Sequence, residues 1–155
     1  MYKHKMRRSE RELTEQQAVE ILEQGSYGVL STIGADGYPY GVPVNYVYDD
    51  GKIYFHCAKN RGHKQENMIF SGKVSFTVVT DSEVDAQKFT TRYRSAIAFG
   101  IAAKTVVDKD MALRALIKKY SPDFENEGYK EIDFQSANCD VFMITIENLS
   151  AKSNL

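Results

Sequence analysis

The sequence has only two cysteines, no long apolar run and almost no excess of charge of either sign. Cys57 and Cys139 fit no metal-ligand spacing and make no disulfide framework, so we expect reduced thiols and a cytoplasmic protein. We find neither a run of membrane-spanning length nor a signal-peptide pattern, and therefore expect no membrane association. The formal net charge of −1 at pH 7 argues against a general affinity for nucleic acid.

Internal repeats, low-complexity tracts and domain linkers are also missing. No Gly-x-Gly-x-x-Gly motif follows a strand pattern, which excludes a separate Rossmann-type site for a dinucleotide. The chain has 155 residues, of which 43% are hydrophobic, and this suffices for one globular domain with a real core. We expect a single domain over residues 1–155, in which residues 1–12 are a basic, mobile lead-in.

Three β-rich runs lie near the start of the chain, and turn sequences separate them. The runs are residues 27–34, 38–48 and 52–57, with Asp36-Gly37 and Asp49-Asp50-Gly51 between them. Asp-Gly between β-rich runs is a strong hairpin signal, so we expect a meander of three antiparallel strands. Pro39 and Pro43 lack the N–H that a ladder needs, which places the second run at an edge, at a bulge or where pairing is interrupted.

Helix and strand patterns alternate through the rest of the chain. A capping box at Thr14 and Gln17 and a stop at Gly25 bound the first helix. Gly100 is expected to mark a bend or bulge. We expect further helices over residues 63–70 and 108–121 and strands over 73–80, 92–107 and 139–149. Residues 81–90 are polar and poorly periodic, and residues 123–138 are expected to form a loop with at most one helical turn. Six strands with attached helices predict a mainly β (α+β) fold, a six-stranded antiparallel barrel or sheet.

Positive charges gather just where one of these helices is expected to begin. Lys59, Arg61, His63 and Lys64 surround the start of the helix over 63–70. Because a helix N-terminus already carries partial positive charge, this arrangement favours a bound anion such as a phosphate. Gly62 would allow close approach of the backbone to that phosphate. The alternative is a solvated basic loop with no ligand.

Six pieces of the sequence resemble, in their order, a known family. They are YGVLST, DGYPYGVPV, DGKIYFHCA, GHK, KVSFTVV and YRSAIAFG, followed by a helix near Asp108. Together they resemble the pyridoxamine 5′-phosphate oxidase-like split-barrel flavoproteins. Within these they are most similar to the nitroimidazole resistance proteins, which MRRSERELT also resembles. The match runs from about Met6 to Leu149. The resemblance implies a split barrel that forms a homodimer and binds FMN at two equivalent sites in the subunit interface.

The resemblance also implies a set of cofactor-binding residues. They are Val42, Pro43, Val44 and Asn45 beside the flavin ring, His56, Cys57 and Ala58 along the ring and ribityl chain, Gly62, His63 and Lys64 at the phosphate, and Tyr93 and Ser95 from the other subunit. The arginine-rich C-terminus of the enzymes that oxidise pyridoxamine phosphate is missing from ENLSAKSNL, so that activity is not expected.

The implied activity is that of an FMN-dependent oxidoreductase resembling a nitroimidazole reductase. Electrons would pass from a nicotinamide donor through FMN to a small aromatic substrate. His56 is the candidate catalytic residue on the substrate side, or else a strand-end histidine bonded into the core. The alternative function is a non-catalytic flavin- or haem-binding protein, in which His56 or His63 could ligate haem iron. Cys57 is expected to be a small buried hydrophobe, and no metal site is expected.

Overall fold

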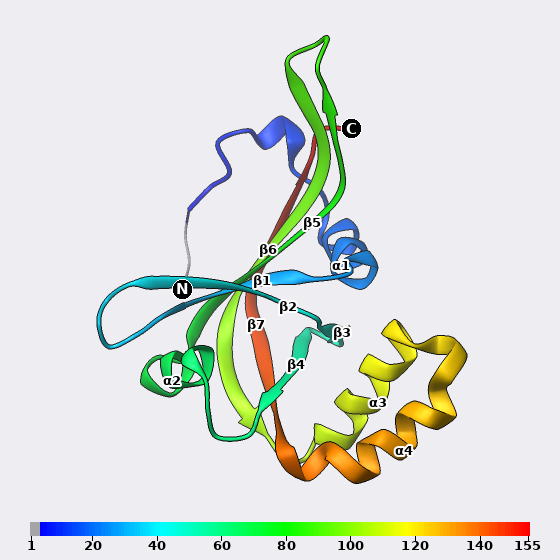
Figure 1. The fold of residues 1–155 in the computed structure, drawn as a ribbon. Coiled ribbons are helices and arrows are strands. Elements are labelled where there is room, and N and C mark those ends of the chain that lie inside the picture. The colour runs from blue at the N-terminus through cyan, green and yellow to red at the C-terminus, as the bar shows by residue number, and fades with distance from the viewer. Residues whose placement is uncertain (1–3) are drawn as a thin grey trace.

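The fold is an antiparallel sheet curled into a split barrel and flanked by helices, as the computed structural model of residues 4–155 shows (Figure 1). Its elements in chain order are α1 (Glu15–Gln24), β1 (Gly28–Ile33), β2 (Pro39–Val44), β3 (Val47–Asp49), β4 (Lys52–Ala58), α2 (His63–Phe70), β5 (Lys73–Asp85), β6 (Thr90–Thr105), α3 (Lys109–Tyr120), α4 (Glu125–Gln135) and β7 (Cys139–Ser153). Short 3₁₀ turns lie at Ser9–Arg11, Pro122–Phe124 and Ser136–Asn138. The predicted mainly β class, with a split barrel and flanking helices, is confirmed.

The order of the strands explains why the sheet curls. Hydrogen bonds join the strands in the order β2-β1-β5-β6-β7-β4-β3, and every pair is antiparallel. The two end strands, β2 and β3, are neighbours in the chain, and only Asn45 and Tyr46 connect them. A two-residue link can join the two edges only if they lie close together. The sheet is therefore closed by covalent connection, while a gap in its hydrogen bonding remains between β2 and β3.

Tyr46 explains why the run over residues 38–48 is two strands instead of one. Its backbone N–H donates to the Tyr120 hydroxyl at 3.0 Å, and that hydroxyl donates to the Tyr46 carbonyl at 3.1 Å. A side chain of α3 thus takes the place of a neighbouring strand. The structure has seven strands where we expected six, and the predicted meander is two hairpins, β1–β2 and β3–β4, at opposite edges of the sheet.

The barrel interior holds the larger of two apolar cores. Strands β1, β4, β5, β6 and β7 contribute alternate side chains to it, and α1 and α2 add theirs from opposite sides of the barrel (Figure 1). The large side chains that are fully buried there include Tyr46, Phe55, Phe76, Ile21 and Leu30. Along β4, Ile53, Phe55 and Cys57 therefore point into the barrel, whereas Tyr54 and His56 point outward.

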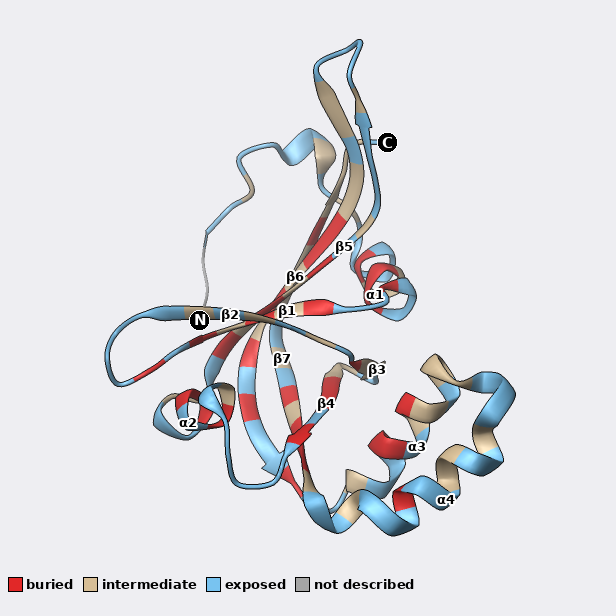
Figure 2. Cartoon of the chain, viewed as in Figure 1, coloured by how far each residue is buried: buried red, intermediate tan, exposed pale blue. Residues whose placement is uncertain are grey.

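Helices α3 and α4 form the second core on the outer face of β4 and β7. Their buried residues face each other and the sheet (Figure 2), where Leu116 and Ile132 pack with Tyr54 and Val141. Helix α4 corrects the expectation of a loop over 123–138. Its apolar signal is weak, because Ile132 is its one buried residue. A Cβ on Gly128 would lie 2.4 Å from Ile117 Cγ2, so this glycine permits the close contact of α4 with α3.

The long hairpin of β5 and β6 extends beyond the barrel (Figure 1). The polar stretch 81–90 forms its tip, where the register shifts between Thr80 and Glu83. The predicted irregularity at Gly100 is confirmed, because the β6–β7 register shifts between Phe99 and Gly100. Residues 1–3 of the expected lead-in lie outside the described residues, and Glu12 forms a β-bridge with Lys152. Over residues 4–155, no helix combines the length and apolar character needed to cross a bilayer.

Candidate functional site

The loop between β4 and α2 presents a helix start that no described side chain caps. Gly62 is the N-cap residue, and its φ of 109° is a conformation that residues with a side chain rarely adopt. The N–H groups of Gln65 and Glu66 bond to the Gly62 carbonyl. The preceding N–H groups, those of His63 and Lys64, have no acceptor within the helix. Lys59, Arg61 and His63 are exposed and Lys64 is half-buried around this start, so the arrangement suits an anion.

A buried amide fixes the start of α2 to the end of β4. Gln65 is only 2% exposed, and its Nε2 donates to the Ala58 carbonyl at 2.5 Å and contacts Cys57 Sγ at 3.0 Å. Burial, partly offset by this contact, raises the pKa of the Cys57 thiol. Cys57 thus behaves as a small core residue, as the sequence predicts, while Ala58 is exposed at the strand end.

Tyr40 brings the edge strand β2 to the same place. Its ring stacks on that of His63, with centroids 4.0 Å apart and planes 28° apart. Further along β2, Val42 and Val44 are half-buried against the barrel core, whereas Pro43 and Asn45 are exposed. Of the three positions that its prolines allow, β2 occupies an edge of the sheet. Its free backbone edge lies beside the gap in the barrel.

His56 lies next to this group, on the outward face of β4. Dehydration by the surrounding protein and, second, the positive charge of Lys64 lower the pKa of His56, which favours the neutral imidazole. The side chain is nevertheless exposed, so it is not bonded into the core as the alternative interpretation required. It borders a cavity of about 290 Å³ between β4, α3 and α4, with Leu113, Leu116, Ile117 and Ile132 as its apolar walls.

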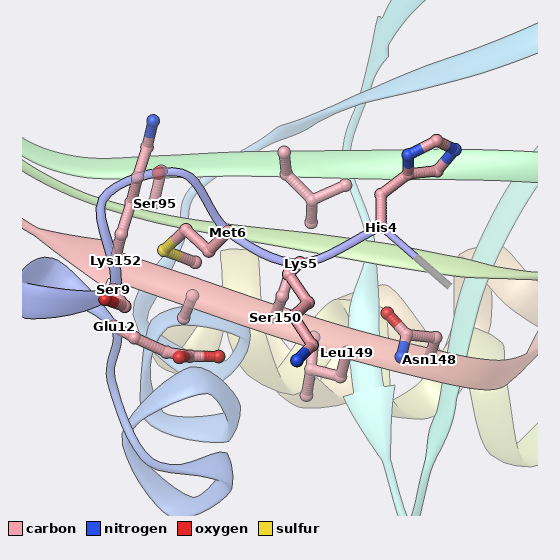
Figure 3. Close-up of a pocket in the computed structure, with 12 residues that line it drawn as sticks. His4, Lys5, Met6, Ser9, Glu12, Ser95, Asn148, Leu149, Ser150 and Lys152 are labelled. Atoms are coloured by element: carbon pink, nitrogen blue, oxygen red, sulfur yellow. The ribbon is translucent and has the colours of Figure 1, made fainter. Parts of the chain in front are cut away.

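Tyr93 and Ser95 lie on β6, far along that strand from the position opposite His56. His56 pairs with Val141, and Val141 pairs with Thr105 at the end of β6. Tyr93 is near the start of β6, so about 40 Å of extended strand separates it from Thr105. Ser95 lines a different cavity, of about 650 Å³, where residues 4–6 pass over β6 and β7 (Figure 3). One chain therefore brings together the predicted residues at the end of β4 and the start of α2, and the two on β6 lie apart from them.

Sequence reasoning missed two side chains that hold this group together. Tyr40 stacks on His63 and lies two residues before Val42, so both side chains are on the same face of β2. The alternation in YPYGVPV could have indicated this shared face. Gln65 has no comparable signal, since a glutamine in the first turn of a helix is ordinarily exposed. Over residues 4–155, no group of three or more His, Cys, Asp or Glu side chains is arranged to hold a metal ion.

Comparisons with known proteins address the family. A family model described as pyridoxamine 5′-phosphate oxidase matches residues 14–153. A search of curated proteins finds no significant match.

Solved structures share the fold at low sequence identity. A candidate 5-nitroimidazole antibiotic resistance protein from Bacteroides thetaiotaomicron is 20% identical, with a TM-score of 0.75 over 92% of this chain and 86% of that one. An FAD-binding protein from Mesorhizobium loti is 23% identical, with a TM-score of 0.65 over 94% and 98%. An FAD and haem binding protein from Mycobacterium smegmatis is 18% identical, with a TM-score of 0.74 over 91% and 71%. Because the family model covers most of the sequence, the chain belongs to the pyridoxamine 5′-phosphate oxidase family.

Proposed function

We propose that this protein is an FMN-dependent oxidoreductase that passes electrons from a nicotinamide donor to a small aromatic substrate such as a nitroaromatic compound. Membership of the family and the fold shared with flavin-binding proteins support a flavin. The candidate nitroimidazole resistance protein supports the substrate class. The unpaired thiols Cys57 and Cys139 suit a reducing cytoplasm.

The start of α2 is the observation that carries the proposal. An uncapped helix start, a glycine with φ of 109° and the cations of Lys59, Arg61 and Lys64 match the requirements of a phosphate dianion. A Cβ at position 62 would meet no atom within 4 Å, so the space in front of the loop is open. These features fit the 5′-phosphate of FMN. Gly62, His63 and Lys64 would hold it, and the edge of β2 from Val42 to Asn45 would lie along the ring.

Bound FMN would supply the redox chemistry, while the protein orients it and limits what reaches it. His56 is exposed beside the cavity between β4, α3 and α4. Its imidazole can donate a hydrogen bond or a proton to a substrate oxygen that gains negative charge. The apolar walls of the cavity suit the faces of an aromatic ring, and polar side chains at the cavity, among them Glu131 and Gln135, can bond polar groups of a substrate.

A homodimer forms part of the proposal. In this dimer we expect Tyr93 and Ser95 to reach the cofactor of the other copy, because within one chain they lie far along β6 from the position opposite His56. The outer face of β1, β5 and β6 carries apolar side chains that solvent reaches, with Val79 52%, Ile33 43% and Ile101 37% exposed. A second copy packed on this face would bury them. Sedimentation of the flavin-loaded protein as a monomer at micromolar concentration would contradict the dimer.

An anaerobic mixing experiment tests the activity. The purified protein should be yellow, NADH or NADPH should bleach it, and a nitroimidazole should restore the colour faster than buffer alone. A yellow protein that neither nicotinamide bleaches would be a flavin binder without this activity.

The second candidate is a haem- or flavin-binding protein without turnover. The shared fold with the FAD and haem binding protein favours it, and the exposed imidazoles of His56 and His63 are possible axial ligands. A Soret band in place of flavin absorbance would support this candidate.

A further inference from the structure

A buried carboxylate beneath the β4–α2 loop holds three parts of the candidate site. Asp140, near the start of β7, is 7% exposed. Its Oδ2 accepts the Asn60 N–H at 2.8 Å, lies 3.0 Å from Lys104 Nζ and lies 3.4 Å from Gln65 Nε2. Gln65 in turn bonds the end of β4, as described above. One side chain thus connects the strand end, the loop and the first turn of α2.

Asn60 is the point at which this carboxylate fixes the loop. Its φ of 51° lies in the left-handed region, which costs free energy for a residue with a side chain. The bond to Asp140 and a second one, from Lys104 Nζ to Asn60 Oδ1 at 3.0 Å, stabilise this conformation. The chain then reaches Gly62, whose own φ is also positive. The direction in which the start of α2 faces depends on both residues.

The positive charge of Lys104 neutralises the negative charge of Asp140. Burial acts to raise the pKa of Asp140, but the Asn60 N–H and the Lys104 ammonium outweigh it and hold that pKa below its ordinary value. The carboxylate is therefore ionised at neutral pH. A lone negative charge beneath a phosphate-binding loop would repel a phosphate dianion. Lys104 makes the pair neutral, so that Asp140 can fix the loop without this repulsion.

We propose that Asp140 and Lys104 are positioning residues that hold residues 59–62 and the start of α2 in the shape that binds a phosphate. They thereby set the preference of the site for a phosphorylated flavin over an unphosphorylated one. This inference rests on the proposed function. Neither residue is expected to touch the flavin ring, so their removal should affect FMN and leave riboflavin almost unchanged.

Titration of the apoprotein with FMN and with riboflavin tests the inference. Asp140→Asn and Lys104→Met should each weaken FMN binding about tenfold, the usual effect of losing a charge-assisted hydrogen bond. Riboflavin binding should change by less than about twofold. A general loosening of the fold would instead weaken the binding of both flavins. Asp110→Asn is the matched control, because it removes an exposed Asp–Arg pair on α3 with no bond to the loop. It should keep the parent preference.

Amide hydrogen exchange in the apoprotein provides a readout that is independent of flavin. The Asn60 N–H should exchange faster in Asp140→Ala than in the parent, while amides of β5 stay protected. Should Asp140 variants fail to fold, Lys104→Met carries the test, because this side chain is 39% exposed. Unchanged preference for FMN in a folded variant, or equal loss of both flavins, overturns the inference. A parent protein with no preference for FMN would instead overturn the phosphate site of the proposed function, and the inference with it.

Discussion

The ring of His63 at the start of α2 stacks on the ring of Tyr40 in the edge strand β2, with the centroids 4.0 Å apart. This contact joins the strand proposed to lie along the flavin to the helix proposed to hold its phosphate. The two segments are otherwise separated by β3 and β4 in the chain. The stack therefore sets the distance between the two halves of the candidate site.

Replacing Tyr40 tests the role of this stack. Tyr40→Phe keeps the aromatic face and should bind FMN like the parent. Tyr40→Ala should weaken FMN binding by about 1 kcal/mol, the usual contribution of an aromatic pair. Flavin fluorescence titration measures both. An equal loss in the two variants would mean that the hydroxyl matters and the stack does not.

His56→Asn should separate a catalytic role from a structural one. Because His56 is exposed, the variant should keep FMN and the melting temperature of the parent. Reoxidation by a nitro substrate should slow on the order of 10²-fold if the imidazole donates a proton. Stopped-flow absorbance measures that step. Turnover at the parent rate would remove His56 from the mechanism.

The lowered pKa of His56 predicts how the rate of reoxidation changes with pH. The protonated imidazole is the proton donor, and its fraction falls as pH rises through a value below the ordinary 6.5. The rate of reoxidation in the parent should therefore fall as pH rises through that range. His56→Asn should lack this dependence. A parent rate that rises with pH over the same range would contradict proton donation by His56.

Filling the cavity beside His56 should hinder the substrate and leave the cofactor bound. Gln135 is an exposed residue of α4 at the cavity, so Gln135→Trp should raise KM for a nitroaromatic substrate several-fold. Phe134→Trp is the control, because the neighbouring Phe134 is 80% exposed and is not among the residues that line the cavity. Steady-state kinetics at saturating FMN compare the two. An equal effect of both variants would place the substrate elsewhere.

Lys119 should lower stability at neutral pH. Its Nζ is buried without a hydrogen-bond partner among the described residues, and burial lowers the pKa of Lys119 from 10.5 to about 8. Such a shift corresponds to a cost of about 3 kcal/mol for the charged form. The Tyr46 ring, 4.0 Å from Nζ, recovers about 0.5–2 kcal/mol of it through a cation–π contact. Lys119→Met should therefore stabilise the fold at pH 7 by about 1–2 kcal/mol.

The pH dependence of that gain follows from the sign of the shift. Below pH 8 the folded and unfolded chains both carry the charge, so the cost is fully present. Between pH 8 and 10.5 the folded chain releases the proton first, and the parent becomes more stable relative to the variant. Urea unfolding of both proteins at pH 7 and pH 10 measures this. If Lys119→Met were more stable than the parent by the same amount at both pH values, burial of the charged ammonium would not be the cause.

Local signals predicted much of the fold. The Asp-Gly turns predicted the β1–β2 and β3–β4 hairpins, and an edge was one of the three positions that the prolines of the second run allowed. The break at Tyr46 was not predictable from neighbours, because the hydroxyl that bonds its backbone comes from Tyr120 in α3. The burial of Lys119 against Tyr46 is a tertiary effect of the same kind, because it brings together residues far apart in the sequence.

In the candidate site, too, local sequence signals predicted some features, whereas others depend on residues that are distant in the sequence. The charge cluster and Gly62 marked the start of α2, since the signal lies within a few residues. Asp140 and Lys104 act on that loop from β7 and β6, and nothing near them in the sequence indicates it. Sequence patterns thus identified the groups that would face a ligand. They did not identify the side chains that hold those groups in place.

The place of β7 in the sheet has a consequence for synthesis of the protein. The three hairpins form between strands that are neighbours in the chain, but β7 pairs with both β6 and β4 and leaves the ribosome after both of them. Until then β4 and β6 each present an unpaired edge, which is a surface for association with other nascent chains. The barrel can therefore close only after translation has passed Cys139–Ser153.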